Sequence, residues 1–153
     1  METGFLVSRD SVEPVIYVIV VDAYIYIGET TAFPAQRWSS HLAPGGSLRK
    51  KLFAIDDRFT DWWKPLQFFS FSCASDLQYF KESQRKTALQ AVEHQVHCDL
   101  GSRPGRLSRK LQVISDTEKT APRFWRDWRS TRVIAHRIVE DLAAALVQHS
   151  INR

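Results

Sequence analysis

Residues 15–42, VIYVIVVDAYIYIGETTAFPAQRWSSHL, carry the pattern that decides the fold. From residue 12 to residue 21 the chain is rich in Val and Ile, which is typical of a buried strand. The next two residues can turn the chain, and residues 24–28 then favour a second strand that pairs back on the first. Pro34 suits the first turn of a helix capped by one of the two preceding threonines, and the Ala-Pro-Gly-Gly sequence at 43–46 ends that helix. The stretch therefore predicts a β-hairpin followed by a short helix.

The rest of the chain adds one strand and three helices. The pattern indicates a helix at 47–55, a strand at 66–75 and a long helix at 81–98. A segment rich in Gly, Pro and Arg follows at 100–108, and a last helix is expected over 120–148. Few strands combined with several helices predict a small α+β domain.

The last predicted helix has one strongly hydrophobic face. An i, i+4 row runs along it, formed by Ile134, Ile138, Leu142 and Leu146. Such a row must be covered, so we expect the helix to pack on the rest of the domain or to form a dimer contact.

Composition and charge narrow the class of protein. The 153 residues are 44% hydrophobic and 25% charged, as in soluble globular domains, and no apolar run has the length of a membrane span. No signal or transit peptide is evident, so a cytoplasmic location is expected. Residues 1–76 hold 7 Lys+Arg against 9 Asp+Glu, whereas residues 77–153 hold 14 against 8. This concentration of positive charge favours a polyanionic partner such as nucleic acid.

Four short motifs occur in a fixed order within residues 13–100. Ile16-Tyr17 and Tyr26-Ile27-Gly28 lie on the two hairpin strands, Arg37 and His41 follow on the first helix, and Glu93 lies on the long helix. In this order they resemble the GIY-YIG nuclease family. The resemblance implies a small three-stranded antiparallel sheet flanked by helices and metal-dependent hydrolysis of DNA to 5′-phosphate and 3′-hydroxyl ends.

The residue types suit this chemistry. Phosphodiester hydrolysis needs a positioned water and neutralisation of the charge that grows on the phosphate. The phenols of Tyr17 and Tyr26 can position a water, and Arg37 offers a charged fork that fits a phosphate. His41, one turn along the same helix face, can orient a phenol or accept a proton. Glu93 is the expected ligand of a single Mg²⁺ or Mn²⁺ ion.

The chain departs from the family pattern at two places. Val15 stands where the first motif usually has Gly. Family members also carry an Asn shortly after the glutamate helix, whereas the only Asn here is Asn152; Ser108 or Arg106 could take over its role.

Several neighbours compete for a part in the site. Tyr24 shares a strand face with Tyr26, so it could assist or only pack. Glu82 lies on the same predicted helix as Glu93. His94 and His97 lie beside that glutamate. His97 shares a helix face with it and could be a second metal ligand, although a surface position or a supporting position behind the metal ligand is favoured. For the acidic cluster Asp56, Asp57 and Asp61 we favour a solvated loop over a metal site.

A basic surface with aromatic residues is the expected DNA contact. Between Arg103 and Arg137 the chain has ten Lys+Arg against three acids, with Phe124, Trp125 and Trp128 among them. Such a mixture suits phosphate contacts combined with stacking, although the tryptophans could equally anchor a helix to the core. The residues expected to contact DNA are Arg49, Lys50, Lys51, Arg103, Arg106, Arg109, Lys110, Arg123, Arg126 and Arg129, of which the last three are expected to form a helical stripe.

Together these features predict residues 1–100 as a catalytic core and 101–153 as a basic helical extension. The expected partner is double-stranded DNA, and a homodimer is expected for double-strand cleavage because each chain offers one site. A nuclease of this size is typical of restriction, defence or mobile-element systems. The alternatives are a non-catalytic nucleic-acid-binding protein of the same fold and a structure-selective repair nuclease.

Overall fold

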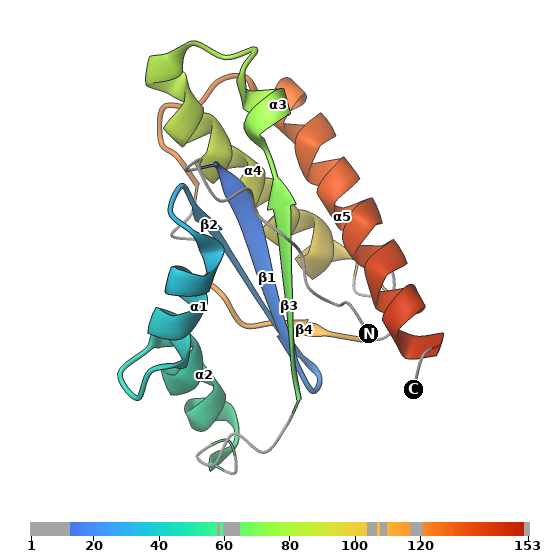
Figure 1. Cartoon of the computed structure of the whole chain (residues 1–153). Helices are drawn as coiled ribbons and strands as arrows, with labels where there is room; N and C mark the ends of the chain where they lie inside the picture. Colours follow the sequence, from blue (N-terminus) through green and yellow to red (C-terminus); the bar gives the residue numbers. More distant parts are fainter. Residues whose placement is uncertain are drawn as a thin grey trace.

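The computed structural model describes residues 13–57, 59, 65–103, 107, 110–116 and 121–151. These residues form a mixed α+β fold in which one sheet lies between two layers of helices (Figure 1). The elements in chain order are β1 (Val15–Val21), β2 (Tyr24–Thr30), α1 (Pro34–Leu42), α2 (Ser47–Ile55), β3 (Leu66–Ser72), α3 (Ala74–Leu77), α4 (Glu82–Ser102), β4 (Gln112–Val113) and α5 (Trp128–Ile151). The predicted α+β class is confirmed.

The sheet has four strands in the order β3-β1-β2-β4, so the prediction of three strands is wrong. β1 pairs antiparallel with both β2 and β3, as expected for a central strand. The additional strand, β4, runs parallel to β2 and pairs only with Tyr24 and Ile25. At two residues it is too short to produce a hydrophobic pattern that the sequence could reveal.

β1 is the centre of the fold, and all seven of its residues are buried. Strands covered on both faces are continuously hydrophobic rather than alternating, which explains the Val/Ile run. The turn to β2 places Asp22 at φ 53°, in the left-handed region that Asp tolerates better than most residues.

The two faces of the sheet pack against different helices. Tyr17, Ile19 and Val21 of β1 face α1 and α2 and form a core with Leu48 and Leu52. The alternate β1 residues face α4 and α5 and belong to a larger core. This larger core also contains Leu89, Val92, Val96, Ile138 and Leu142. Tyr17 is thus held by its strand register on the side of α1.

The last helix is shorter than predicted, and its hydrophobic row is not free. α5 begins at Trp128 rather than near residue 120, because Asp127 caps it with its Oδ1 accepting a hydrogen bond from the Ser130 amide at 3.2 Å. The row of Ile134, Ile138, Leu142 and Leu146 is buried against the chain's own core, at 0–6% exposure. Of the alternatives expected for this row, the structure therefore shows packing on the core.

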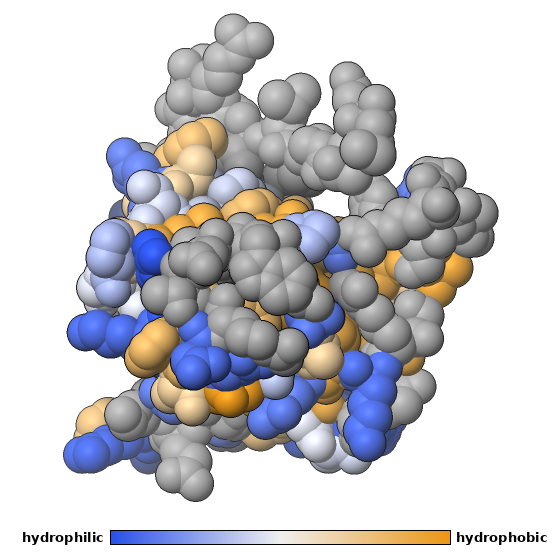
Figure 2. All heavy atoms as spheres, turned by 90° about the horizontal axis from the view of Figure 1, so that it is seen from below, coloured by the Kyte–Doolittle hydropathy of each residue, from blue (hydrophilic) through white to orange (hydrophobic). Residues whose placement is uncertain are grey.

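The surface of the described residues is mixed in character. Figure 2 shows hydrophobic residues reaching the surface between hydrophilic ones at the lower end of the molecule. The large hydrophobic side chains that are exposed are Phe33, Phe53, Ile55, Tyr79, Phe124, Val133 and Val147. Among the described residues, we find no helix with the combination of length and hydrophobicity that crossing a bilayer requires.

Candidate active site

Tyr17 lies at the bottom of the site, in a row of three residues across the sheet. Its register partners are Gly28 on β2 and Ser70 on β3. The Tyr17 ring lies against the backbone of Gly28. A Cβ added at Gly28 would clash with the phenol oxygen and with the Cζ atom. Only glycine leaves room for the Tyr17 ring at this position, which explains sterically why the Tyr-Ile-Gly motif ends in Gly28. Burial, followed by the neighbouring Tyr26, raises the pKa of the Tyr17 phenol, so Tyr17 keeps its proton at neutral pH.

His41 is placed by α1 directly above this phenol. The Tyr17 hydroxyl and Nε2 of His41 lie 2.5 Å apart, a short hydrogen bond between two buried side chains. The Tyr26 ring lies beside the imidazole, with 4.8 Å between ring centroids. Burial, followed by the positive charge of Arg37, lowers the pKa of His41 from 6.5 to about 4. The imidazole is therefore neutral at neutral pH.

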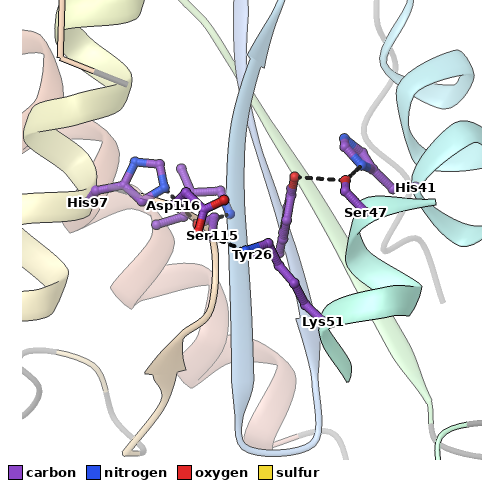
Figure 3. A network of polar contacts seen from close by, with 8 residues as sticks. Tyr26, His41, Ser47, Lys51, His97, Ser115 and Asp116 are labelled. Carbon is purple, nitrogen blue, oxygen red and sulfur yellow. Dashed lines mark hydrogen bonds and ion pairs between the residues drawn. The ribbon is translucent and has the colours of Figure 1, made fainter. Parts of the chain in front are cut away.

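Ser47 completes the group, and its role was not predicted. Its Oγ lies 2.7 Å from Nδ1 of His41 and 3.1 Å from the Tyr26 hydroxyl (Figure 3). The unbroken polar chain is thus Tyr17–His41–Ser47–Tyr26. Gly46 makes it possible, because a Cβ there would clash with the carbonyl of His41. A glycine pair immediately before a serine is the signal in the sequence that two helices could meet here.

Arg37 lies exposed on α1, one turn before His41. Its positive charge adds to the effect of burial in lowering the pKa of His41. In Tyr17 and Glu93 it partly opposes burial, which raises the pKa of both groups. α1 and α4 cover opposite faces of the sheet, and the charge of Arg37 acts on groups of both helices.

Glu93 is a buried carboxyl on α4, only 8% exposed. Burial, followed by the negative charge of Glu29, raises its pKa from 4.5 to about 8, whereas Lys86 and Arg37 act in the opposite direction. Lys86 binds Glu29, with Nζ 2.8 Å from each carboxylate oxygen. Burial makes ionisation of a carboxyl unfavourable, and a bound cation stabilises the ionised form. Mg²⁺ is commonly bound by one or two carboxylates together with waters. The carboxyl of Glu93 is therefore suited to bind a divalent cation, whereas both carboxylate oxygens of Glu29 are engaged by Lys86.

Larger metal clusters are not found in the part of the chain that the structure describes. No group of three or more His, Cys, Asp or Glu side chains comes together there as a metal site. Cys73 and Cys98 are both free thiols.

A second polar chain lies on the other side of β2, and in it His97 holds a buried supporting position rather than a position on the surface. His97 is 1% exposed, and its Nδ1 donates to the carbonyl of Glu93 at 2.9 Å. Its Nε2 therefore accepts from Ser115, with Oγ 2.6 Å away, and Ser115 accepts from the Ile27 amide at 3.0 Å. This chain connects the middle of the Tyr-Ile-Gly motif to the backbone of Glu93. Beyond the glutamate helix, Ser115 is a bonding residue that the described part of the chain shows, whereas Ser108 and Arg106 lie outside that part.

The same segment also binds the opposite helix layer. Asp116 pairs with Lys51 of α2, with 2.8 Å between Oδ1 and Nζ. The segment after β4 thus contacts α4 through Ser115 and α2 through Asp116, as Figure 3 shows on the two sides of β2. Lys51 is therefore engaged in an ion pair.

The remaining basic residues are spread over several elements. Arg123 and Arg126 precede α5, so with Arg129 they do not form the predicted helical stripe. Trp125 is buried and donates to Thr131 Oγ1 at 3.3 Å, and Trp128 packs on the larger core, so both tryptophans anchor α5. The exposed basic residues of the predicted DNA surface are Lys50, Arg103, Lys110, Arg123, Arg126 and Arg129, and Arg49 is half-buried. Arg106 and Arg109 lie outside the described residues, as do Ser108, Asp61 and Asn152.

Comparisons of the chain with models of known protein families, with curated proteins and with solved structures found no match.

Proposed function

We propose that the chain is a Mg²⁺- or Mn²⁺-dependent endonuclease that hydrolyses phosphodiester bonds of double-stranded DNA, as its GIY-YIG resemblance implies. The observation that carries this proposal is the polar chain from Tyr17 through His41 and Ser47 to Tyr26. The charges of Arg37 and Glu93 act on the phenol at its buried end. Structural packing alone does not require a neutral imidazole held between two tyrosines.

The chain's own residues can carry the proton transfers of hydrolysis. Tyr17 keeps its proton and donates it to His41, so the lone pairs of its oxygen can accept a hydrogen bond from a water. As this water attacks the phosphorus, its proton passes to the Tyr17 oxygen, and the Tyr17 proton passes to Nε2 of His41. The bond from phosphorus to the 3′-oxygen breaks and that oxygen takes a proton from solvent, which leaves a 5′-phosphate and a 3′-hydroxyl. His41 then releases its proton to solvent. A pKa of about 4 keeps Nε2 unprotonated and ready for this step at neutral pH.

The phosphate itself is held by charge. Arg37 is exposed beside the tyrosines and can bind two phosphate oxygens with its planar fork. Glu93 would hold the divalent cation. When bound, that cation supplies positive charge that stabilises the negative charge growing on the phosphate and the leaving oxygen.

The proposed function also includes contacts with the DNA backbone and a second copy of the chain. The exposed basic residues around α5 and α2 would contact the DNA backbone, and cleavage of both strands would require two copies of the chain. Restriction, defence or mobile-element activity is the proposed setting. A structure-selective repair nuclease and a non-catalytic DNA-binding protein are the alternatives.

A cleavage assay on defined substrates tests the proposal. Purified protein with Mg²⁺ is incubated with plasmid, linear duplex, branched DNA and RNA, and the product ends are mapped. We expect duplex cleavage with 5′-phosphate ends that EDTA abolishes and that Tyr17→Phe reduces at least about 100-fold. Tyr79→Phe is the matched control, because Tyr79 is 85% exposed and outside the site. If every substrate stays intact and Glu93→Ala binds DNA as the wild type does, the nuclease proposal is refuted and the non-catalytic DNA-binding alternative is supported.

A further inference from the structure

We propose that Ser47 is a positioning residue that fixes the tautomer of His41 and gives the two tyrosines opposite hydrogen-bonding roles toward the substrate. The tautomer part depends only on the geometry of the described residues. The consequence for cleavage rests on the proposed nuclease function.

The first step is proton accounting at the imidazole. A neutral histidine has one donor and one acceptor nitrogen, and the bond made by one nitrogen determines the state of the other. The Tyr17 hydroxyl is buried and protonated, and 2.5 Å from it lies Nε2 of His41. A phenol can donate or accept, so Tyr17 alone permits either tautomer; when Nε2 accepts the Tyr17 proton, Nδ1 carries the ring hydrogen. Ser47 Oγ, 2.7 Å from Nδ1, is the acceptor that holds this tautomer.

The second step follows the chain to Tyr26. Because the His41 N–H occupies a lone pair of Ser47 Oγ, the Ser47 hydrogen is available for the Tyr26 oxygen, which lies 3.1 Å away. Tyr26 then accepts from within the protein, and its own hydrogen points outward. The hydrogen bonds run in one direction, Tyr17 to His41 to Ser47 to Tyr26. Tyr17 therefore presents an acceptor to the water, and Tyr26 presents a donor to a phosphate oxygen.

The position of Ser47 in its helix argues against a merely structural role. Ser47 is the first residue of α2, but the cap position is Gly46, and no side-chain cap bond is made there. The side chain is also exposed. Alanine favours helices, so Ser47→Ala is expected to leave the fold intact. Its effect should be confined to His41 and Tyr26.

Nitrogen NMR of the His41 ring tests the tautomer directly, without DNA or metal. In the wild type we expect a protonated Nδ1 and an unprotonated Nε2. Ser47→Ala should shift the signals toward the Nε2–H tautomer, and Ser47→Thr, which retains a hydroxyl, should restore them. Ser39→Ala, an exposed serine on α1, is the matched control and should change nothing. A wild-type ring protonated on Nε2, or a tautomer unaffected by Ser47→Ala, would overturn the inference.

Kinetics then test the consequence for the reaction. Loss of one neutral hydrogen bond should lower kcat of Ser47→Ala about 3- to 10-fold with little change in KM, at unchanged melting temperature. Ser47→Thr should recover most of this loss. A raised KM with unchanged kcat, or no recovery by Thr, would contradict a positioning role. A wild type with the expected tautomer that cuts no substrate would refute the nuclease proposal and leave the tautomer inference standing.

Discussion

Replacing Glu93 by Gln should make the protein more stable at alkaline pH while removing its cation site. The carboxyl of Glu93 has a pKa of about 8 in the folded chain against 4.5 as its ordinary value. A raised acid pKa means that the folded state binds the proton more tightly than the unfolded state. The resulting stability is fully present below about pH 4.5 and is lost as the pH rises through about 8. Gln cannot ionise and therefore escapes this loss.

The size of the effect follows from the two pKa values. Each pH unit between them lowers the unfolding free energy of the wild type by about 1.4 kcal/mol. Between about pH 5 and about pH 9, the difference in stability between Glu93→Gln and the wild type should therefore grow by up to about 4 kcal/mol. Hydrogen bonding by the amide at this buried position reduces the absolute gain but not its dependence on pH.

Urea unfolding at both pH values, in the absence of divalent cations, measures this difference. Glu82→Gln is the matched control on the same helix, because Glu82 is exposed and should show the wild-type pH dependence. Addition of Mg²⁺ at the higher pH should stabilise the wild type and not Glu93→Gln, since only the carboxylate binds the ion. If the unfolding free energies of the wild type and of Glu93→Gln changed with pH in parallel, the raised pKa of Glu93 and its role as a buried cation ligand would be refuted.

Three other substitutions test the packing around the site. Gly28→Ala should displace the Tyr17 ring, because the added Cβ falls on the phenol, and cleavage should drop at least about 10-fold; an unchanged rate would show that the ring does not need this space. Ser115→Ala leaves a buried imidazole and a strand amide without their partner, and should cost about 1–3 kcal/mol in urea unfolding; a loss well below this range would contradict the bridge. Lys51→Ala breaks an exposed ion pair with Asp116 and should cost no more than about 1 kcal/mol, so a larger loss would assign this pair a greater part in holding the sheet edge.

Much of the site could be predicted because it depends on local patterns. The hairpin, α1 and α4 each have a clear hydrophobic period or turn signal, and these elements carry Tyr17, Tyr26, Arg37, His41 and Glu93. Alternation along a strand and the i, i+4 spacing of a helix are sufficient to decide which side chains share a face. The tyrosine and histidine were therefore expected to meet, and they do.

The features that were missed depend on contacts between distant residues. Ser115 bonds to Ile27, 88 positions away, through a β4 strand of two residues that leaves no periodic signal. Ser47 reaches His41 only because Gly46 allows two helices to come close. The start of α5 was misplaced because Trp125 is buried in the core ahead of the helix, a tertiary contact that interrupts an otherwise helical composition.

The most direct test of the central claim is cleavage of a labelled DNA duplex by the wild type and by Glu93→Gln across a Mg²⁺ titration. We expect the wild type to cut with saturable dependence on Mg²⁺ and to produce 5′-phosphate ends. Glu93→Gln should bind the duplex but leave it uncut at every Mg²⁺ concentration. Equal cleavage by the two proteins, or the absence of cleavage by a correctly folded wild type, would contradict the account.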